Sequence, residues 1–306
     1  MLERTIAVIN GKGGVGKTSI TTNLGALVAA AGYRVLVVDL DPQGNAGRDL
    51  GVTDTPDDDQ GSALFAAVAT GVPLRAVASV RERLDLVCGG ERIEEMVGAL
   101  DARANRAGAA TVATAVRDAL APTAADYDLI VIDCPPGGQK LQRMALTAAE
   151  YALIPTKSDA ASLDGLVKVA HLFADVTATS NPHLSLLGVA LFGIGPSAKR
   201  IAREARDTVA RDLGDPDLVF EATIRHAEGA AVAARNRGRL MHELEEALPG
   251  EQKAYFEQLR RNAGGKHRAD KPAPRIAASS ATLAADYQAL AAEVLDRIAA
   301  RAGATS

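Results

Sequence analysis

Short runs of β-branched and aliphatic residues recur along the chain, separated by longer stretches of helix-forming residues. Continuous apolar runs of this length predict strands that are buried on both faces. The predicted strands are Thr5–Ile9, Arg34–Asp39, Leu84–Val87, Leu129–Asp133, Tyr151–Pro155 and Leu186–Gly193. The predicted helices cover residues 19–31, 62–69, 91–100, 111–120, 162–177, 197–213 and 277–302. Strands that alternate with helices in this way predict an α/β fold, with a doubly wound, mostly parallel sheet flanked by helices.

A glycine-rich loop, N-G-K-G-G-V-G-K-T over residues 10–18, lies between the first predicted strand and the first predicted helix. It matches the pattern G-x-x-x-x-G-K-[ST] of phosphate-binding loops. Glycines let successive backbone N–H groups point into one concavity, and the helix N-terminus adds partial positive charge there. Lys17 would reach the β- and γ-phosphates, and the Thr18 hydroxyl would bind Mg²⁺. The residues predicted to hold the nucleotide are Gly11, Lys12, Gly13, Gly14, Val15, Gly16, Lys17, Thr18 and Ser19.

Two further predicted strands end in aspartate, at the sheet edge where open α/β folds bind ligands. Arg34–Asp39 leads into Asp41 two residues later. Leu129–Asp133 is followed by C-P-P-G and has the form of a Walker B strand, whose carboxylate holds Mg²⁺ through water. A purely structural alternative remains, since an aspartate before a proline also initiates turns and Asp39 could cap one.

Three motifs resemble those of the ParA/MinD family of ATPases. K-G-G-V-G-K-T resembles the family's deviant Walker A loop, D-L-D-P-Q-G-N over residues 39–45 looks like the second ParA signature, and S-L-D-G-L over 162–166 is similar to S-x-x-G-L. The resemblance runs from about residue 5 to residue 234 and implies a P-loop NTPase fold of the deviant Walker A type. It also implies that Lys12 crosses a homodimer interface to the partner's nucleotide, that Asp41 positions the hydrolytic water, and that Asp39 lies near the Mg²⁺ shell. The implied catalytic residues are thus Lys12, Lys17 and Asp41, the metal-binding residues are Thr18, Asp39 and Asp133, and the cofactors are ATP and Mg²⁺.

Composition limits the function classes. Net charge is −4 over 306 residues and aromatics make up 3% with no Trp, so nucleic-acid binding would depend on a local basic patch and not on base stacking. No apolar run reaches the ~18 residues of a membrane span, and the early first strand leaves no room for a secretory signal. Two cysteines without metal-type spacing suit a reducing cytoplasm.

A basic strip is predicted on one side of the helix over 197–213, opposite an apolar side that includes Ile201. ParA relatives use basic residues here and after the following strand for sequence-independent binding of double-stranded DNA. T-I-R-H-A-E-G-A over 223–230 is similar to the family's I-P-R-x-x-x-x-E-A, with the usual proline replaced. The alternative is a solvated helix face paired locally with Glu204 and Asp207. The candidate DNA-binding residues are Lys199, Arg200, Arg203, Arg206, Arg225, Arg235 and Arg237.

Three segments are expected: an ATPase core over 1–248, a basic and partly flexible insertion over 249–275, and a C-terminal helix over 276–306 packed on the core. Residues 251–275 hold seven Lys and Arg against three acids, a net charge of +4, and could contact DNA or merely solvate the insertion. The last helix has a mostly alanine apolar face, which buries too little area for membrane docking.

The resemblance therefore implies a cytoplasmic, nucleoid-associated DNA partition ATPase of the Soj-like kind, with slow hydrolysis that a ParB-like partner stimulates and no membrane partner. The alternatives are a MinD-like membrane-associated positioning ATPase, an ATPase that regulates another assembly, and an iron–sulfur redox protein. The last is disfavoured because Cys88 precedes the Walker B strand and does not follow it.

Overall fold

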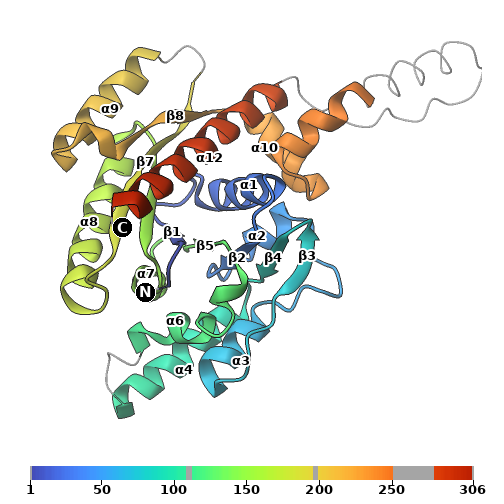
Figure 1. Ribbon diagram of the computed structural model, residues 1–306, viewed down its shortest axis with the longest axis vertical. Coiled ribbons are helices and arrows are strands. Elements are labelled where there is room, and N and C mark those ends of the chain that lie inside the picture. Colours follow the sequence, from blue (N-terminus) through green and yellow to red (C-terminus); the bar gives the residue numbers. More distant parts are fainter. Residues whose placement is uncertain (1, 108–111, 196–198, 251–278, 305–306) are drawn as a thin grey trace, which may run out of the picture.

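The computed structural model describes residues 2–107, 112–195, 199–250 and 279–304, and an eight-stranded sheet runs through its centre (Figure 1). The strand order is β3-β4-β2-β5-β1-β6-β7-β8, and every neighbouring pair is parallel except the antiparallel β3–β4 pair. The predicted doubly wound, mostly parallel sheet is confirmed. The strands are β1 Thr5–Val8, β2 Val35–Asp39, β3 Val77–Arg81, β4 Leu84–Val87, β5 Leu129–Asp133, β6 Tyr151–Thr156, β7 Ser185–Ile194 and β8 Val219–Arg225.

Helices cover both faces of this sheet. One face carries α1 (Lys17–Ala30), α2 (Asn45–Asp49), α10 (Glu228–Arg237) and α12 (Ser279–Ala304). The other carries α3 (Ser62–Thr70), α4 (Arg92–Ala107), α6 (Ala115–Leu120), α7 (Gln139–Ala148), α8 (Ala160–Thr179) and α9 (Lys199–Leu213). Short 3₁₀ turns span Ala124–Asp126 and Pro216–Leu218, and residues 241–250 are also helical.

The two faces have separate cores, which explains why the strands read as continuous apolar runs. Ile6 and Val8 of β1 pack with α1 and α12, while Ala7 packs with the helices of the opposite face. The central strands β1, β2, β5 and β6 are buried at every position. Alternation is lost because both sides of each strand face protein.

The helix α12 is attached to the edge of the sheet by charged side chains as well as by its apolar face. Glu293 accepts hydrogen bonds from the backbone N–H groups of Glu221 and Ala222, both at 3.0 Å. Arg297 donates to the carbonyl oxygens of Leu187 and Val219 at 3.0 and 3.1 Å. Glu221 and Ala222 lie where the register of β8 with β7 shifts, so Glu293 satisfies backbone N–H groups at this irregularity.

Several details differ from the sequence predictions. The elements β3, β8, α2, α7 and α10 were not among those predicted, and the helix expected over 111–120 is represented by α6, which begins at Ala115. β3 lacks the apolar pattern of a strand because it is a largely exposed edge with Ser79 at a positive φ of 55°. Ile201 was expected to face the core, but its side chain is 47% exposed. Residues 251–275 of the expected basic insertion lie outside the described residues.

Within the described ranges, no helix combines the length and the apolar character needed to cross a bilayer.

Leu290→Ala on α12 is expected to lower the free energy of unfolding by about 2–5 kcal/mol, because it leaves a cavity at a side chain that is 1% exposed. Urea unfolding followed by circular dichroism measures this change. Gln288→Ala, at an exposed position on the same helix, is the matched control. Equal stability of the two variants would contradict the packing of α12 on the core.

Candidate nucleotide site

The glycine loop connects β1 to α1 and has the backbone of a phosphate-binding loop. Gly14 and Gly16 have positive φ angles of 70° and 88°, which glycine adopts without strain. Asn10 is fully buried and fixes the start of the loop. Its side-chain amide donates to the carbonyl of Pro155 at 2.8 Å, and its Oδ1 accepts from the backbone N–H of Lys12 at 2.8 Å. The loop is therefore anchored to the end of β6.

Lys17 points into the loop. Its side chain is 6% exposed, and Nζ donates to the carbonyl oxygen of Lys12 at 2.9 Å. Burial lowers the pKa of Lys17, and the nearby carboxylates of Asp133 and Asp41 oppose this shift. The ammonium thus lies among the loop's own backbone groups, close to two of the predicted carboxylates.

Asp39 and Asp133 stand side by side, because they are register partners at the ends of β2 and β5. Both are completely buried. Burial raises the pKa of Asp39 to about 7, and burial together with the charge of Asp39 raises that of Asp133 well above its ordinary value. Asp133 Oδ2 accepts from the Thr18 hydroxyl at 2.6 Å, whereas Oδ1 has no hydrogen-bond partner among the described residues.

These groups fit a magnesium ion. An unpartnered buried carboxylate oxygen beside a hydroxyl offers the hard oxygen ligands that Mg²⁺ prefers. Asp39 is less available, since its two oxygens already accept from the backbone N–H groups of Asp41 and Ala46 at 2.8 and 3.0 Å. In the described part of the chain, no three His, Cys, Asp or Glu side chains form a metal cage. This is expected for an ion that keeps waters and phosphate oxygens as ligands.

Asp41 forms a turn and also lies near the loop lysine. The structural interpretation, a turn residue, is therefore compatible with the functional one, a residue of the nucleotide site. Its Oδ1 accepts from the backbone N–H of Gln43 at 2.9 Å, and its carbonyl accepts from Gly44 at 3.0 Å and Gly90 at 3.1 Å. The side chain is 6% exposed and contributes to the electrostatic field at Lys17. Asp41 is thus held in a fixed position at the edge of the site.

Lys12 forms an ion pair within its own chain. Its Nζ lies 2.5 Å from Asp159 Oδ1, with the side chains 34% and 47% exposed. Asp159 follows the end of β6, next to β1 in the sheet. No sequence pattern singled out Asp159, because it lies beyond the last residue of β6, whereas Asp39 and Asp133 are the last residues of their strands.

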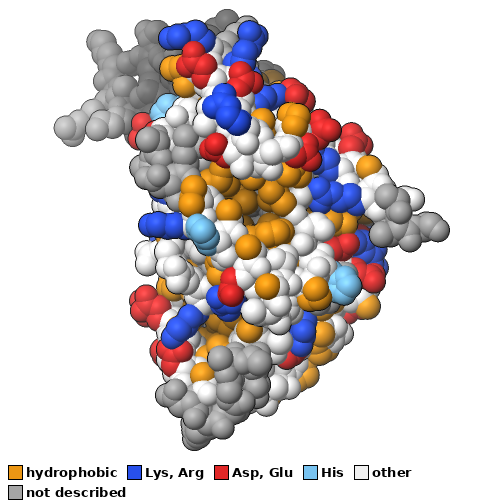
Figure 2. Space-filling view, turned by 90° about the vertical axis from the view of Figure 1, so that its left-hand side faces the viewer, with side chains coloured by type: hydrophobic (Ala, Val, Ile, Leu, Met, Phe, Trp, Pro, Cys, Tyr) orange, Lys and Arg blue, Asp and Glu red, His pale blue; other side chains and the backbone are white. Residues whose placement is uncertain are grey.

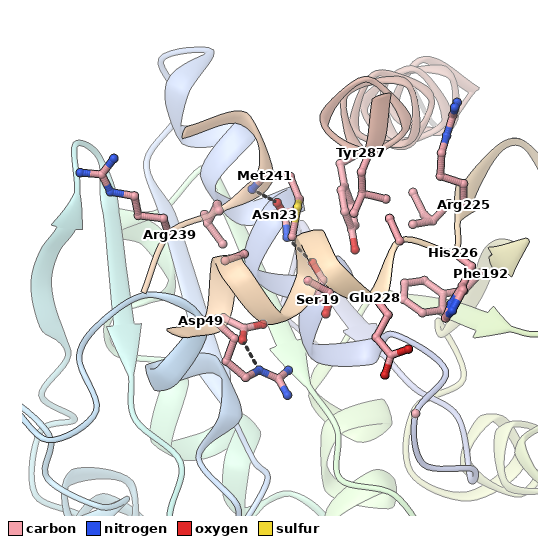
Figure 3. A pocket seen from close by; sticks show the side chains of 18 of the residues that line it. Ser19, Asn23, Asp49, Phe192, Arg225, His226, Glu228, Arg239, Met241 and Tyr287 are labelled. Atoms are coloured by element: carbon pink, nitrogen blue, oxygen red, sulfur yellow. Dashed lines mark hydrogen bonds and ion pairs between the residues drawn. The ribbon is translucent and has the colours of Figure 1, made fainter. Parts of the chain in front are cut away.

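A cavity of about 270 Å³ adjoins the loop at Gly14 and Ser19 (Figure 3). Its walls come from Phe192 of β7, from residues 224–228 at and after the end of β8, and from Tyr287 of α12. Phe192 packs tightly on the loop, since a Cβ on Gly16 would lie 2.3 Å from its ring. The buried Tyr287 side chain extends toward Ser19, and burial raises the pKa of its hydroxyl. No local motif marks Phe192 or Tyr287, because each reaches the site from a distant element.

The candidate DNA-binding residues fall into separate groups. Those on α9 and those on α10 lie at opposite ends of α12 (Figure 1). Four arginines are paired with acids: Arg200 with Glu204 at 3.1 Å, Arg206 with Glu221, Arg225 with Asp286 at 2.7 Å and Arg235 with Asp49 at 3.0 Å. Arg203 is exposed, Arg237 lies in the last turn of α10, and of Lys199 only its place at the start of α9 is described. The face that carries α8 and α9 mixes positive and negative side chains (Figure 2). The available positive charge is therefore smaller than the sequence indicates.

Both cysteines are buried free thiols. Burial raises the pKa of the Cys88 thiol to about 12 and that of Cys134 well above its ordinary value. These are the properties of packed core cysteines.

Without nucleotide and Mg²⁺, the free energy of unfolding is expected to fall as the pH rises from about 4 to about 7. The pKa of Asp39 is raised from 3.8 to about 7 in the folded chain, so over this interval the folded state binds more protons than the unfolded state. Urea unfolding in EDTA at about pH 5 and about pH 7 measures the effect, with Asp39→Asn as the variant that lacks this titration. An equally steep fall in Asp39→Asn would contradict it.

Comparison with known proteins identifies the family. A family model described as an AAA domain matches residues 3–186. The chromosome partitioning protein ParA of Myxococcus xanthus is 37% identical over 190 residues, which cover 61% of this chain and 64% of that protein. The chromosome partitioning protein ParA of Caulobacter vibrioides is 33% identical over 231 residues, covering 74% of this chain and 83% of that protein.

Solved structures agree on the fold. The cobyrinic acid a,c-diamide synthase of Mycobacterium smegmatis, solved with ADP and magnesium, matches with a TM-score of 0.63 and 26% identity over 89% of this chain and 99% of that chain. The cell division ATPase MinD of Pyrococcus furiosus matches with a TM-score of 0.64 over 96% of this chain and 98% of that chain, but at 23% identity it supports the fold alone. With this loop, these carboxylates and these relatives, the chain belongs to the ParA/Soj family of P-loop ATPases, and its cofactors are ATP and Mg²⁺.

Proposed function

We propose that this chain is a DNA partition ATPase whose nucleotide state controls its dimerisation and its binding to DNA. The observation that carries the proposal is the joint presence of the complete phosphate loop, with Lys12 at its start, and the Asp39–Asp41 turn. Relatives at 33–37% identity named chromosome partitioning proteins support it. The cavity beside Gly14 and Ser19 would take the base and ribose of the nucleotide.

In this proposal the loop amides and Lys17 bind the phosphates. Thr18 and Asp133 hold Mg²⁺, with Asp39 behind them, and the ion would neutralise charge on the phosphate oxygens. Asp41 orients the attacking water from the rigid turn in which its carbonyl accepts two hydrogen bonds. Hydrolysis is slow in the isolated chain, and a ParB-like partner bound at a centromere site accelerates it.

Two subunits would close face to face, with each Lys12 reaching the opposite nucleotide. Lys12 must first leave Asp159, which holds it within its own subunit. Exchange of one anionic partner for another keeps the ammonium paired throughout, because an unpaired buried ammonium would be costly. In the free subunit, Lys12 is therefore held by Asp159 and does not extend toward a partner subunit.

Closure would align exposed basic residues from both subunits into one DNA-binding surface, without sequence preference, and the protein would be nucleoid-associated. The ion pairs at Arg200, Arg206, Arg225 and Arg235 leave the exposed Arg203 of α9 as a main contributor. With roughly four phosphates neutralised, log affinity would fall with log salt at a slope of about −3.6.

A MinD-like positioning ATPase on a membrane is the second candidate, because the MinD fold covers nearly the whole chain. It predicts ATP-dependent binding to anionic liposomes and no binding to DNA. The described exposed face of α12 does not favour this candidate. Residues such as Ala285 and Gln288 occupy that face, where membrane docking would need large apolar side chains.

ATP·Mg²⁺ is expected to induce binding of an arbitrary labelled duplex, and ADP·Mg²⁺ is not. Fluorescence anisotropy measures the binding of wild type beside Lys12→Ala and Lys17→Ala, both of which should lose it. Arg203→Ala should weaken it about equally on every duplex and make the salt slope shallower by about 1.8, because each of the two subunits loses one phosphate contact.

Equal DNA binding in ATP and ADP would contradict the nucleotide switch. ATP-dependent binding to anionic liposomes without binding to DNA would instead support the MinD-like candidate.

Asp159→Asn is expected to favour the dimer, because it weakens the hold on Lys12 in the free subunit. A partly exposed pair of this kind contributes at most about 1 kcal/mol, so the protein concentration for half-maximal ATP-dependent DNA binding should fall by up to about five-fold. Asp126→Asn, an exposed aspartate just before β5, controls for loss of the same charge. An unchanged or higher half-maximal concentration in Asp159→Asn would contradict the role of this pair.

A further inference from the structure

Two adjacent glycines, Gly89 and Gly90, lie directly against the Asp39–Gly44 turn. They follow Cys88 at the end of β4, which is the parallel neighbour of β2. The carboxyl ends of β2 and β4 therefore bring the two segments together. The two glycines belong to none of the motifs found in the sequence.

Gly89 leaves no space for any side chain. A Cβ at this position would lie 2.5 Å from the carbonyl oxygen of Asp41 and 2.6 Å from Cγ of Asp39. The backbone of Gly89 is not in the left-handed region, where glycine alone is comfortable. Its conformation would accept another residue, so only its contact with the two aspartates requires glycine.

Gly90 holds the same turn by a hydrogen bond. Its backbone N–H donates to the Asp41 carbonyl at 3.1 Å, beside the bond from Gly44 at 3.0 Å. On its other side, Gly90 packs against the backbone of Gln60. Its φ is 136°, and a Cβ there would lie 2.7 Å from backbone atoms of Gln60. The N–H of Arg92 donates to the Gln60 carbonyl at 3.1 Å, so a hydrogen bond also joins the segment after Gly90 to Gln60. Asp41 thus rests on a rigid backbone surface.

We infer that Gly89 and Gly90 are positioning residues that set the place of Asp41 for hydrolysis by close backbone contact. The inference rests on the proposed role of Asp41 in orienting water. Misplacement of a catalytic group by about 1 Å can cost about 10²-fold in rate. Because the pair touches the turn and not the phosphate loop, it acts on kcat and not on nucleotide binding.

Gly89→Ala is the direct test, with steady-state phosphate release as the measurement. We expect kcat to fall about 10- to 100-fold while KM for ATP stays within about three-fold. Gly98→Ala, on the exposed side of α4 where a Cβ would meet nothing within 4 Å, should match wild type. Circular dichroism and binding of a fluorescent ADP analogue check that each variant is folded with an intact loop.

A double-mutant cycle with Asp41→Ala shows whether the glycine acts through the aspartate. Gly89→Ala should add little to the loss of kcat in Asp41→Ala, because both remove the same function. An additional 10-fold loss in that background would overturn the inference, as would wild-type kcat in Gly89→Ala or loss of nucleotide binding. Wild-type kcat in Asp41→Ala would instead overturn the proposed role of Asp41 itself.

If Gly89→Ala does not fold, Gly44→Ala tests the same contact between the two segments, with the added methyl group on the Asp39–Gly44 turn. Its Cβ would lie 3.4 Å from the Gly89 carbonyl oxygen, and its φ is 58°. A smaller loss of kcat, about three- to ten-fold, with unchanged KM is expected. Unchanged kcat in a folded Gly44→Ala would overturn the inference.

Discussion

Burial of two carboxylates side by side, at the ends of β2 and β5, is the constraint on which this site depends. Asp39 and Asp133 are register partners without exposure to solvent, and the buried ammonium of Lys17 lies close to Asp133. Two like charges removed from water are unfavourable unless a cation balances them or a proton neutralises one. The raised pKa values of both groups express this cost. A bound Mg²⁺ would remove it, so the site is prepared for the ion at the expense of stability.

The order of the strands places every functional group along one edge of the sheet. β2 ends at Asp39, β5 at Asp133, β1 leads into the phosphate loop, and β6 is followed by Asp159, and these four strands are consecutive neighbours. β4, on the other side of β2, ends next to Gly89. Because parallel strands all end at the same edge, a single topology assembles the phosphate loop, the metal ligands and the turn that carries Asp41.

Much of this arrangement could be predicted from local sequence. Apolar runs without alternation indicated buried parallel strands, and the glycine pattern with its flanking strand and helix indicated the phosphate loop. Asp39 and Asp133 could be found because each ends such a run. β3 could not, since its edge position gives it no apolar pattern.

Contacts between distant segments were beyond local patterns. The acids that pair with two candidate DNA-binding arginines illustrate this: Asp286 and Asp49 neutralise Arg225 and Arg235 from positions 61 and 186 residues away. Tyr287 of the last helix likewise lines the same cavity as Ser19, from far along the chain. Gly89 carries no signal either, because its necessity comes from the space that Asp39 and Asp41 occupy and not from its own backbone angle.

Sedimentation velocity tests the nucleotide switch most directly, with the chain in ATP·Mg²⁺, in ADP·Mg²⁺ and in ATP with EDTA. A dimer in ATP·Mg²⁺ alone, with monomer in the other two conditions, is the predicted result. The same assembly state in all three would contradict the coupling of the buried carboxylate site to subunit closure.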